Sequence, residues 1–175
     1  MSPRLSRRVF FRTSVVAVGS LGMVGATRAD STSGTDEFRH EVVRSPEEWL
    51  ARLGEHDFRI LRLGETEVPE SSEIWDETRE GAYHCKGCEL HVYESEWKVP
   101  LDKGWAFFRH SVPNSLLMGI DWADGAGPNM GADALSTIEV HCRRCGGHMG
   151  HILLVEGSVL HCINGASLEF RPQLT

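Results

Sequence analysis

The chain has 175 residues, of which 41% are hydrophobic and 25% charged, a composition typical of a folded globular domain and not of a disordered or fibrous chain. Five of its 18 basic residues fall within residues 1–29, which contain no Asp or Glu. Residues 30–175 therefore carry 13 basic against 25 acidic residues, a formal charge of −12. A body this acidic, without a basic run, repels phosphate backbones, so we do not expect nucleic acid as a partner.

The first 29 residues have the pattern of an export signal. A basic segment precedes an apolar, small-residue run over residues 15–26, and Thr27-Arg28-Ala29 then resembles a cleavage site. The apolar run is shorter than the roughly 20 residues that cross a bilayer, so we expect no stable membrane span. Residues 6–11 read SRRVFF, and a pair of arginines before an apolar run is typical of a twin-arginine signal. The alternative is an ordinary basic region in which two arginines are adjacent by chance.

The mature chain divides into a polar linker over residues 30–44 and one domain over residues 45–175. Ser45-Pro46-Glu47-Glu48 has the features of a helix start, with a serine cap, a proline at the first position and a glutamate at the third. Gly54 ends this helix, and residues 58–63 predict a second short one.

After Pro69 the pattern changes to short strands separated by Gly, Pro and Asp, which predicts a mainly β, antiparallel domain. Residues 111–135 are rich in Gly, Pro and Asn and predict a long loop. The predicted strands lie at residues 81–84, 90–93, 137–141 and 151–155.

Four of the five cysteines form two C-x-x-C pairs, Cys85 with Cys88 and Cys142 with Cys145. Two such pairs are typical of paired knuckles around one tetrahedral, structural zinc ion with no open coordination position. The second interpretation is two disulfides, which are common in exported proteins, and the third is redox-active cysteine pairs. A bridge across two residues is strained and closes a very short loop, which favours zinc.

The fifth cysteine, Cys162, has no partner once zinc has taken the other four. A reactive thiol needs donor or cationic neighbours, and His148 and His151 follow the second pair closely in the sequence HMGH. Residues i and i+3 of a regular strand face opposite sides, so the intervening glycine, Gly150, predicts a bend that lets both histidines point the same way. Core or surface histidines are the alternative reading.

Taken together, these residues resemble the methionine-R-sulfoxide reductases of the B type, over about residues 45–172. The resemblance implies two antiparallel sheets of the β-tent type, braced by zinc and preceded by short helices. The segments that carry it are GAYHCKGC at 81–88, KGW at 103–105, EVHCRRC at 139–145, HMGH at 148–151 and CINGASL at 162–168.

The resemblance also implies roles for single residues. Cys162 would attack the sulfoxide sulfur and become a sulfenic acid, while His148 and His151 protonate the sulfoxide oxygen. Trp105 would face the substrate methyl group, and Asn164 would orient the site. The substrate would be methionine-R-sulfoxide, in exported proteins or as the free amino acid, and the reductant a thioredoxin-like protein or a small thiol.

The chain departs from the family near the proposed nucleophile. Leu160 stands where relatives commonly have an arginine, two residues before the cysteine, so one supporting cation is missing. Lys103 stands where many relatives have a second, recycling cysteine. Two other functions therefore stay open, a zinc-braced β-tent module that binds a ligand without turnover and a thiol enzyme of different specificity.

The arginine pair gives the first testable prediction. Replacing both Arg7 and Arg8 by lysine should leave the precursor in the cytoplasm, because the twin-arginine pathway reads that pair. Cell fractionation with immunoblotting measures the distribution, and a single Arg4→Lys variant is the control. Continued export of the double variant to the periplasm would instead indicate an ordinary secretory signal.

Overall fold

The computed structural model describes residues 38–122 and 136–174. The predicted export signal, residues 1–29, and the first part of the predicted linker, residues 30–37, lie outside these ranges. No helix within the two ranges has the length and apolar character that a membrane crossing requires.

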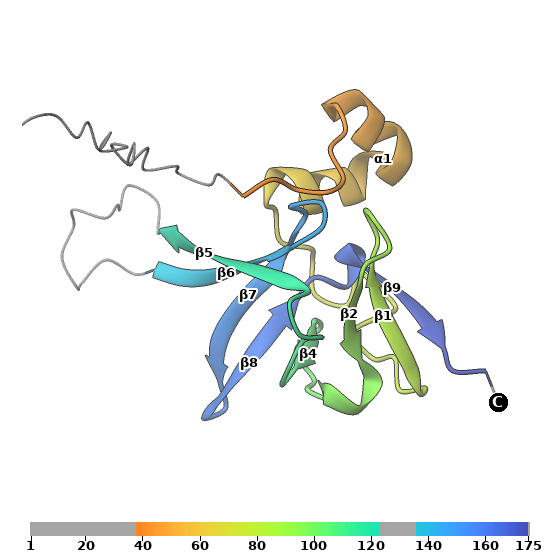
Figure 1. Cartoon of the computed structure of the whole chain (residues 1–175). Helices are drawn as coiled ribbons and strands as arrows, with labels where there is room; N and C mark the ends of the chain where they lie inside the picture. Colours follow the sequence, from red (N-terminus) through yellow and green to blue (C-terminus); the bar gives the residue numbers. More distant parts are fainter. Residues whose placement is uncertain (1–37, 123–135, 175) are drawn as a thin grey trace, which may run out of the picture. The chain divides into compact units, whose positions relative to one another are not determined.

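One kinked helix and two antiparallel sheets make up the described domain (Figure 1). The smaller sheet has the order β2-β1-β9 and the larger one β3-β4-β8-β7-β6-β5. This confirms the predicted mainly β architecture. The elements are α1 (Pro46–Leu63), β1 (Gly81–Cys85), β2 (His91–Glu94), η1 (Ser95–Trp97), β3 (Lys98–Val99), β4 (Ala106–Phe108), β5 (Leu116–Trp122), β6 (Ser136–Cys142), β7 (His148–Val155), β8 (Ser158–Ile163), η2 (Gly165–Ser167) and β9 (Leu168–Pro172).

Helix α1 begins where the sequence predicts. The Ser45 hydroxyl accepts the Glu48 backbone N–H, and the Glu48 carboxylate accepts the Ser45 N–H in return, which forms a capping box. The prediction of two short helices needs correction, because one helical element runs to Leu63 with a kink at Gly54. Gly54 adopts φ 75°, ψ 168°, which interrupts the helix at this one residue. Residues 55–57 include no proline or glycine, so the helix resumes directly after Gly54.

The prediction that residues 111–135 form a loop is wrong for residues 116–122. Leu116–Trp122 is strand β5, which pairs along its whole length with β6. Gly119 and the exposed Met118 and Ile120 conceal the strand pattern, because this edge strand lacks the usual alternation of buried and polar side chains. Residues 123–135 lie outside the described ranges.

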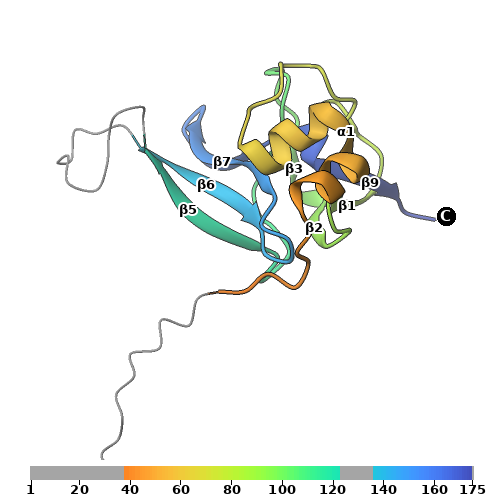
Figure 2. The ribbon, with the colours of Figure 1, turned by 90° about the horizontal axis from the view of Figure 1, so that it is seen from above.

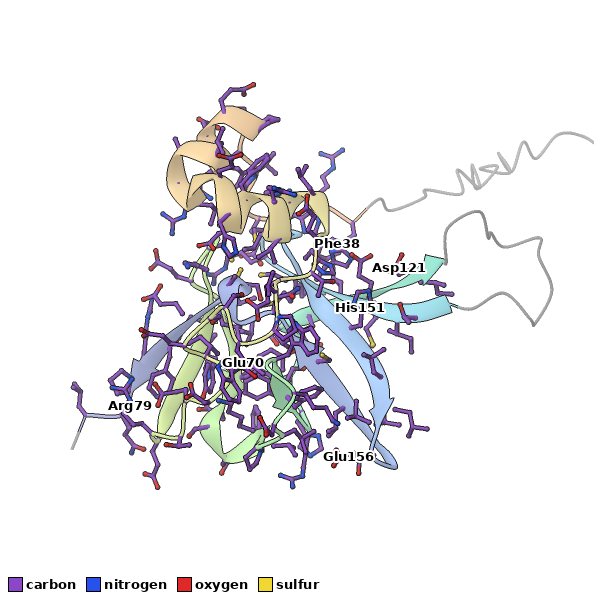
Figure 3. The ribbon with its side chains drawn as sticks, turned by 180° about the vertical axis from the view of Figure 1, so that it is seen from behind. Phe38, Glu70, Arg79, Asp121, His151 and Glu156 are labelled. Atoms are coloured by element: carbon purple, nitrogen blue, oxygen red, sulfur yellow. The ribbon has the colours of Figure 1, made fainter. Side chains whose placement is uncertain are left out.

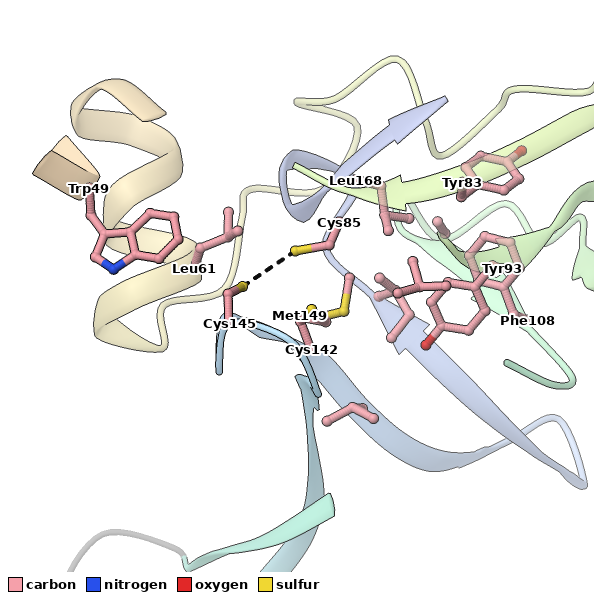
Figure 4. Close-up of a cluster of buried hydrophobic side chains, with 14 residues drawn as sticks. Trp49, Leu61, Tyr83, Cys85, Tyr93, Phe108, Cys142, Cys145, Met149 and Leu168 are labelled. Atoms are coloured by element: carbon pink, nitrogen blue, oxygen red, sulfur yellow. Dashed lines mark hydrogen bonds between the residues drawn. The ribbon is translucent and has the colours of Figure 1, made fainter. Parts of the chain in front are cut away.

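Seen from above, α1 lies over part of the small sheet (Figure 2). The buried core side chains come from α1 and from strands of both sheets. Tyr93 stacks on Phe108 with ring centroids 4.2 Å apart, and Tyr83 meets Phe108 edge-on at 5.1 Å. Trp49 and Leu61 of α1 contribute to the same cluster as three cysteines (Figure 4). The core therefore connects the helix, both sheets and the cysteine pairs in one packed unit.

Candidate functional site

The four paired cysteines converge from two sheets. Cys85 ends β1 in the small sheet, and Cys142 ends β6 in the large sheet. The Sγ atoms of Cys85 and Cys145 lie 3.7 Å apart, and those of Cys88 and Cys142 lie 3.5 Å apart (Figure 4). A tetrahedral ion with metal–sulfur bonds of about 2.3 Å sets its sulfur atoms about 3.8 Å apart. The four thiols can therefore hold one metal ion, and none of them is in a disulfide.

The negative charge of four close thiolates also requires a cation in this cluster. Hydrogen bonds among the four thiols, together with burial, raise the pKa of Cys85 well above its ordinary value. The hydrogen bond with Cys145 is the largest cause that raises the pKa of Cys142, while the hydrogen bond with Cys85 acts the other way. Four thiolates this close cannot all be charged in a buried site without a positive ion between them.

Cys162 lies on β8 in the middle of the large sheet. It stands directly opposite His151 of β7 and Phe107 of β4, and His151 stands opposite Glu139 of β6. Opposite residues in antiparallel strands share a face, so Cys162, His151 and Glu139 project from the same side. Burial first, and then the negative charge of Glu67, raise the pKa of Cys162 to about 11. The resting thiol is therefore neutral at pH 7.

The two histidines of the HMGH segment meet, as the sequence predicts. Gly150 has φ 148°, and the register of β6 and β7 shifts near this point. The rings of His148 and His151 then lie 5.4 Å apart, edge to face. A Cβ atom on Gly150 would lie 2.1 Å from the Cys162 carbonyl oxygen, so only glycine allows β7 to approach β8 this closely.

Each histidine is held by a carboxylate. His148 donates from Nδ1 to Glu139 at 2.5 Å. His151 donates from Nε2 to Asp121 at 3.0 Å, and both of these residues are labelled in Figure 3. Burial lowers the pKa of His148, so its imidazole is neutral at pH 7. Its Nε2 atom is buried and has no hydrogen-bond partner among the described residues. This nitrogen is available to a ligand.

Glu67 organises the backbone that follows Cys162. Its side chain is buried, and its two carboxylate oxygens accept the N–H groups of Gly165 at 2.6 Å and Ala166 at 2.8 Å. Its own N–H donates to Asn164 Oδ1 at 3.1 Å, and its carbonyl accepts the Trp105 indole N–H at 3.2 Å. One residue thus fixes the turn after Cys162, the Asn164 amide and the Trp105 ring.

The structure brings together most of the residues that the sequence singles out. Cys162, His148 and His151 lie around one patch of the large sheet, and Asn164 and Trp105 join them through Glu67. Lys103 instead pairs with Glu156 in the β7–β8 turn, at 2.9 Å. Leu160 is buried, so no cation stands where relatives have an arginine.

Sequence reasoning missed Glu67, Glu139 and Asp121 as members of this site. Glu139 lies in the EVHC segment, three residues before Cys142, and directly precedes the buried Val140. A charged residue between the apolar residues Ile138 and Val140 on a central strand is a detectable pattern. Nothing local marks Glu67, because its partners lie 38 to 99 residues away.

Comparison with known proteins gives consistent matches over this domain. The SelR domain model matches residues 53–172. Peptide methionine sulfoxide reductase B3 of Arabidopsis thaliana is 36% identical over 136 residues, 75% of this chain and 71% of the relative. Peptide methionine sulfoxide reductase MsrB of Methylibium petroleiphilum is 30% identical over 146 residues, 81% of this chain and 99% of the relative. Among solved structures, the Mis18 Yippee-like domain aligns with a TM-score of 0.43 and 18% identity, over 55% of this chain and 99% of that chain.

The Glu67 contacts predict a measurable cost of losing one acceptor. Glu67→Gln keeps the side-chain shape but sets an amide N–H₂ against a backbone N–H, so we expect destabilisation of about 1–3 kcal/mol in urea unfolding. Glu65→Gln is the matched control, because Glu65 is more exposed and pairs with Arg59. Equal unfolding midpoints for both variants would show that the Glu67 contacts do not support the fold.

Proposed function

The chain belongs to the SelR family of peptide methionine sulfoxide reductases B, and we propose that it reduces the R epimer of methionine sulfoxide with Cys162 as the nucleophile. The family makes the chain an oxidoreductase that acts on methionine sulfoxide. One observation carries the assignment of Cys162. It is the only cysteine outside the metal-binding cluster, and it faces His151 on the neighbouring strand.

In the proposed reaction the Cys162 sulfur attacks the sulfur of the sulfoxide. The oxygen passes to Cys162 and takes up the thiol proton, so methionine leaves reduced and Cys162 becomes a sulfenic acid. His148 and His151 transfer that proton to the oxygen, and the partnerless Nε2 of His148 supports this role. Trp105 contacts the substrate methyl group, and Asn164 orients the turn that carries the nucleophile.

Recycling proceeds through an external thiol. Within the chain, the other four cysteines form the metal-binding cluster and Lys103 replaces the usual second cysteine. One thiol therefore converts the sulfenic acid into a mixed disulfide and water, and a second thiol releases Cys162 as the disulfide leaves. The reductant is a small thiol or a thioredoxin-like protein.

We assign zinc to the four-cysteine cluster. Cys85, Cys88, Cys142 and Cys145 supply four sulfur ligands, which leaves no open position, so the ion is structural. Its contribution is to hold the two sheets together. With the export signal at residues 1–29, the reductase acts outside the cytoplasm and repairs exported proteins.

Stereospecific turnover tests the proposed reaction. With dithiothreitol as reductant, the mature protein should convert methionine-R-sulfoxide in a peptide and leave the S epimer unchanged, as followed by chiral chromatography. Cys162→Ser should lose all turnover, because a hydroxyl is a much weaker nucleophile than a thiol. A folded protein without turnover of either epimer would favour the binding module.

Metal analysis tests the zinc assignment. The purified protein should hold one tightly bound zinc per chain, and Cys85→Ser should lose the zinc and unfold, because zinc affinity is part of the folding free energy. Cys162→Ser should keep both. Two disulfides by mass spectrometry in a protein without zinc would contradict the assignment.

The raised pKa of Cys162 predicts a pH profile. The thiol is mostly protonated below its pKa of about 11, so the rate of iodoacetamide labelling of Cys162, which needs only the thiolate, should rise about tenfold per pH unit from pH 7 to 10. Leu160→Arg places a cation on the same strand face and should shift the labelling profile to lower pH. Leu160→Met is the neutral control. A flat labelling profile, or identical profiles for the two variants, would contradict the raised pKa of Cys162 or the effect of a cation on it.

A further inference from the structure

A second group of metal-ligand side chains lies beside the proposed active site, apart from the four cysteines. Glu139 and His141 lie on β6, and His148 lies on β7. The His148 Nδ1 atom is 2.5 Å from one Glu139 oxygen, and the His141 Nε2 atom is 3.1 Å from the other. One ligand atom from each of the three residues lies within 4.8 Å of the others. A single carboxylate thus draws two imidazoles together.

This donor set suits a particular class of ion. Two imidazole nitrogens and one carboxylate oxygen favour zinc and similar first-row transition metals over magnesium or calcium. Tetrahedral zinc with bonds of about 2.0–2.1 Å would place its ligand atoms about 3.3 Å apart. The ligand atoms of the three residues now lie within 4.8 Å of one another, so small side-chain rotations would bring them to that spacing. The side chains of His141 and Glu139 are 30% and 23% exposed, which gives an ion access from solvent.

Burial limits how an ion could bind at His148. The His148 side chain is only 3% exposed, so the ion would enter from the side of Glu139 and His141 and bind through Nδ1, the nitrogen that faces Glu139. The Nε2 atom, on the other side of the ring, has no partner among the described residues and does not coordinate the ion. The other comparable group, His84, His91 and Glu94, does not bring its ligand atoms within the same distance.

We propose that Glu139, His141 and His148 form a second binding site for a transition-metal ion such as zinc, and that its occupancy inhibits the enzyme. The inhibitory half rests on the proposed function, in which His148 transfers a proton. An ion on Nδ1 displaces the proton that this nitrogen donates to Glu139, so the neutral ring carries its proton on Nε2 and cannot take up the thiol proton. Free metal would thus switch the reductase off reversibly, without disturbing the structural zinc.

Metal binding to the zinc-loaded protein tests the site. Equilibrium dialysis against Zn²⁺ should add one ion per chain to the wild type and none to His141→Gln. His91→Gln is the matched control and should bind as the wild type does, because His91 pairs with Glu94 elsewhere. With Co²⁺ as the added ion, the new absorption should lack thiolate-to-metal charge transfer. No added ion in the wild type, an added ion in His141→Gln, or a thiolate band would each overturn the site.

Activity measured at the same metal concentrations tests the inhibition. Filling the site should lower wild-type turnover about a hundredfold or more, the size of a lost proton transfer, and a chelator that leaves the four-cysteine zinc in place should restore it. Mg²⁺ should have no effect. A bound second ion with full turnover would overturn the inhibition. If no variant reduces methionine sulfoxide at all, the proposed function fails, while the dialysis still decides whether the metal site exists.

Discussion

The four-cysteine cluster is the constraint on which the rest of the domain depends. Cys85 ends a strand of the small sheet and Cys142 ends a strand of the large sheet, so the proposed ion between them would tie the two sheets together. Trp49 and Leu61 of α1 pack against the same cluster (Figure 4). His148 begins β7 three residues after Cys145, so a fixed knuckle also fixes the first proposed proton donor. Under the proposed zinc assignment, structure and chemistry are therefore coupled through a metal that takes no part in the reaction.

The proposed nucleophile sits in a surrounding that disfavours its charged form. Cys162 is half-buried, Glu67 adds a negative charge, and Leu160 offers no compensating cation. Glu67 is nevertheless required by the backbone, because two N–H groups of the turn after Cys162 would otherwise lose their buried acceptor. The site thus gains a rigid geometry at the cost of thiol reactivity. We therefore expect slow turnover at neutral pH, with a rate that depends strongly on the few groups that transfer protons.

Sequence reasoning succeeded where the determining interactions are local. The Ser45 capping box and the bend at Gly150 each depend on residues three or fewer positions apart, and both are confirmed. The cysteine pairs could be joined across 53 intervening residues only because their spacing has a known chemical meaning. Strand β5 and the role of Glu67 depend instead on partners that tertiary folding brings together. No periodicity in the chain records those contacts.

The central claim is a division of labour, in which four cysteines hold a structural zinc and the fifth performs the chemistry. Zinc-edge X-ray absorption of protein that carries one equivalent of zinc tests it most directly, before and after reaction with one equivalent of methionine-R-sulfoxide without added thiol. The account predicts four sulfur ligands at about 2.3 Å in both states, with oxidation confined to Cys162. Loss of a sulfur ligand on oxidation would contradict it, because a zinc ligand would then be taking part in the reaction.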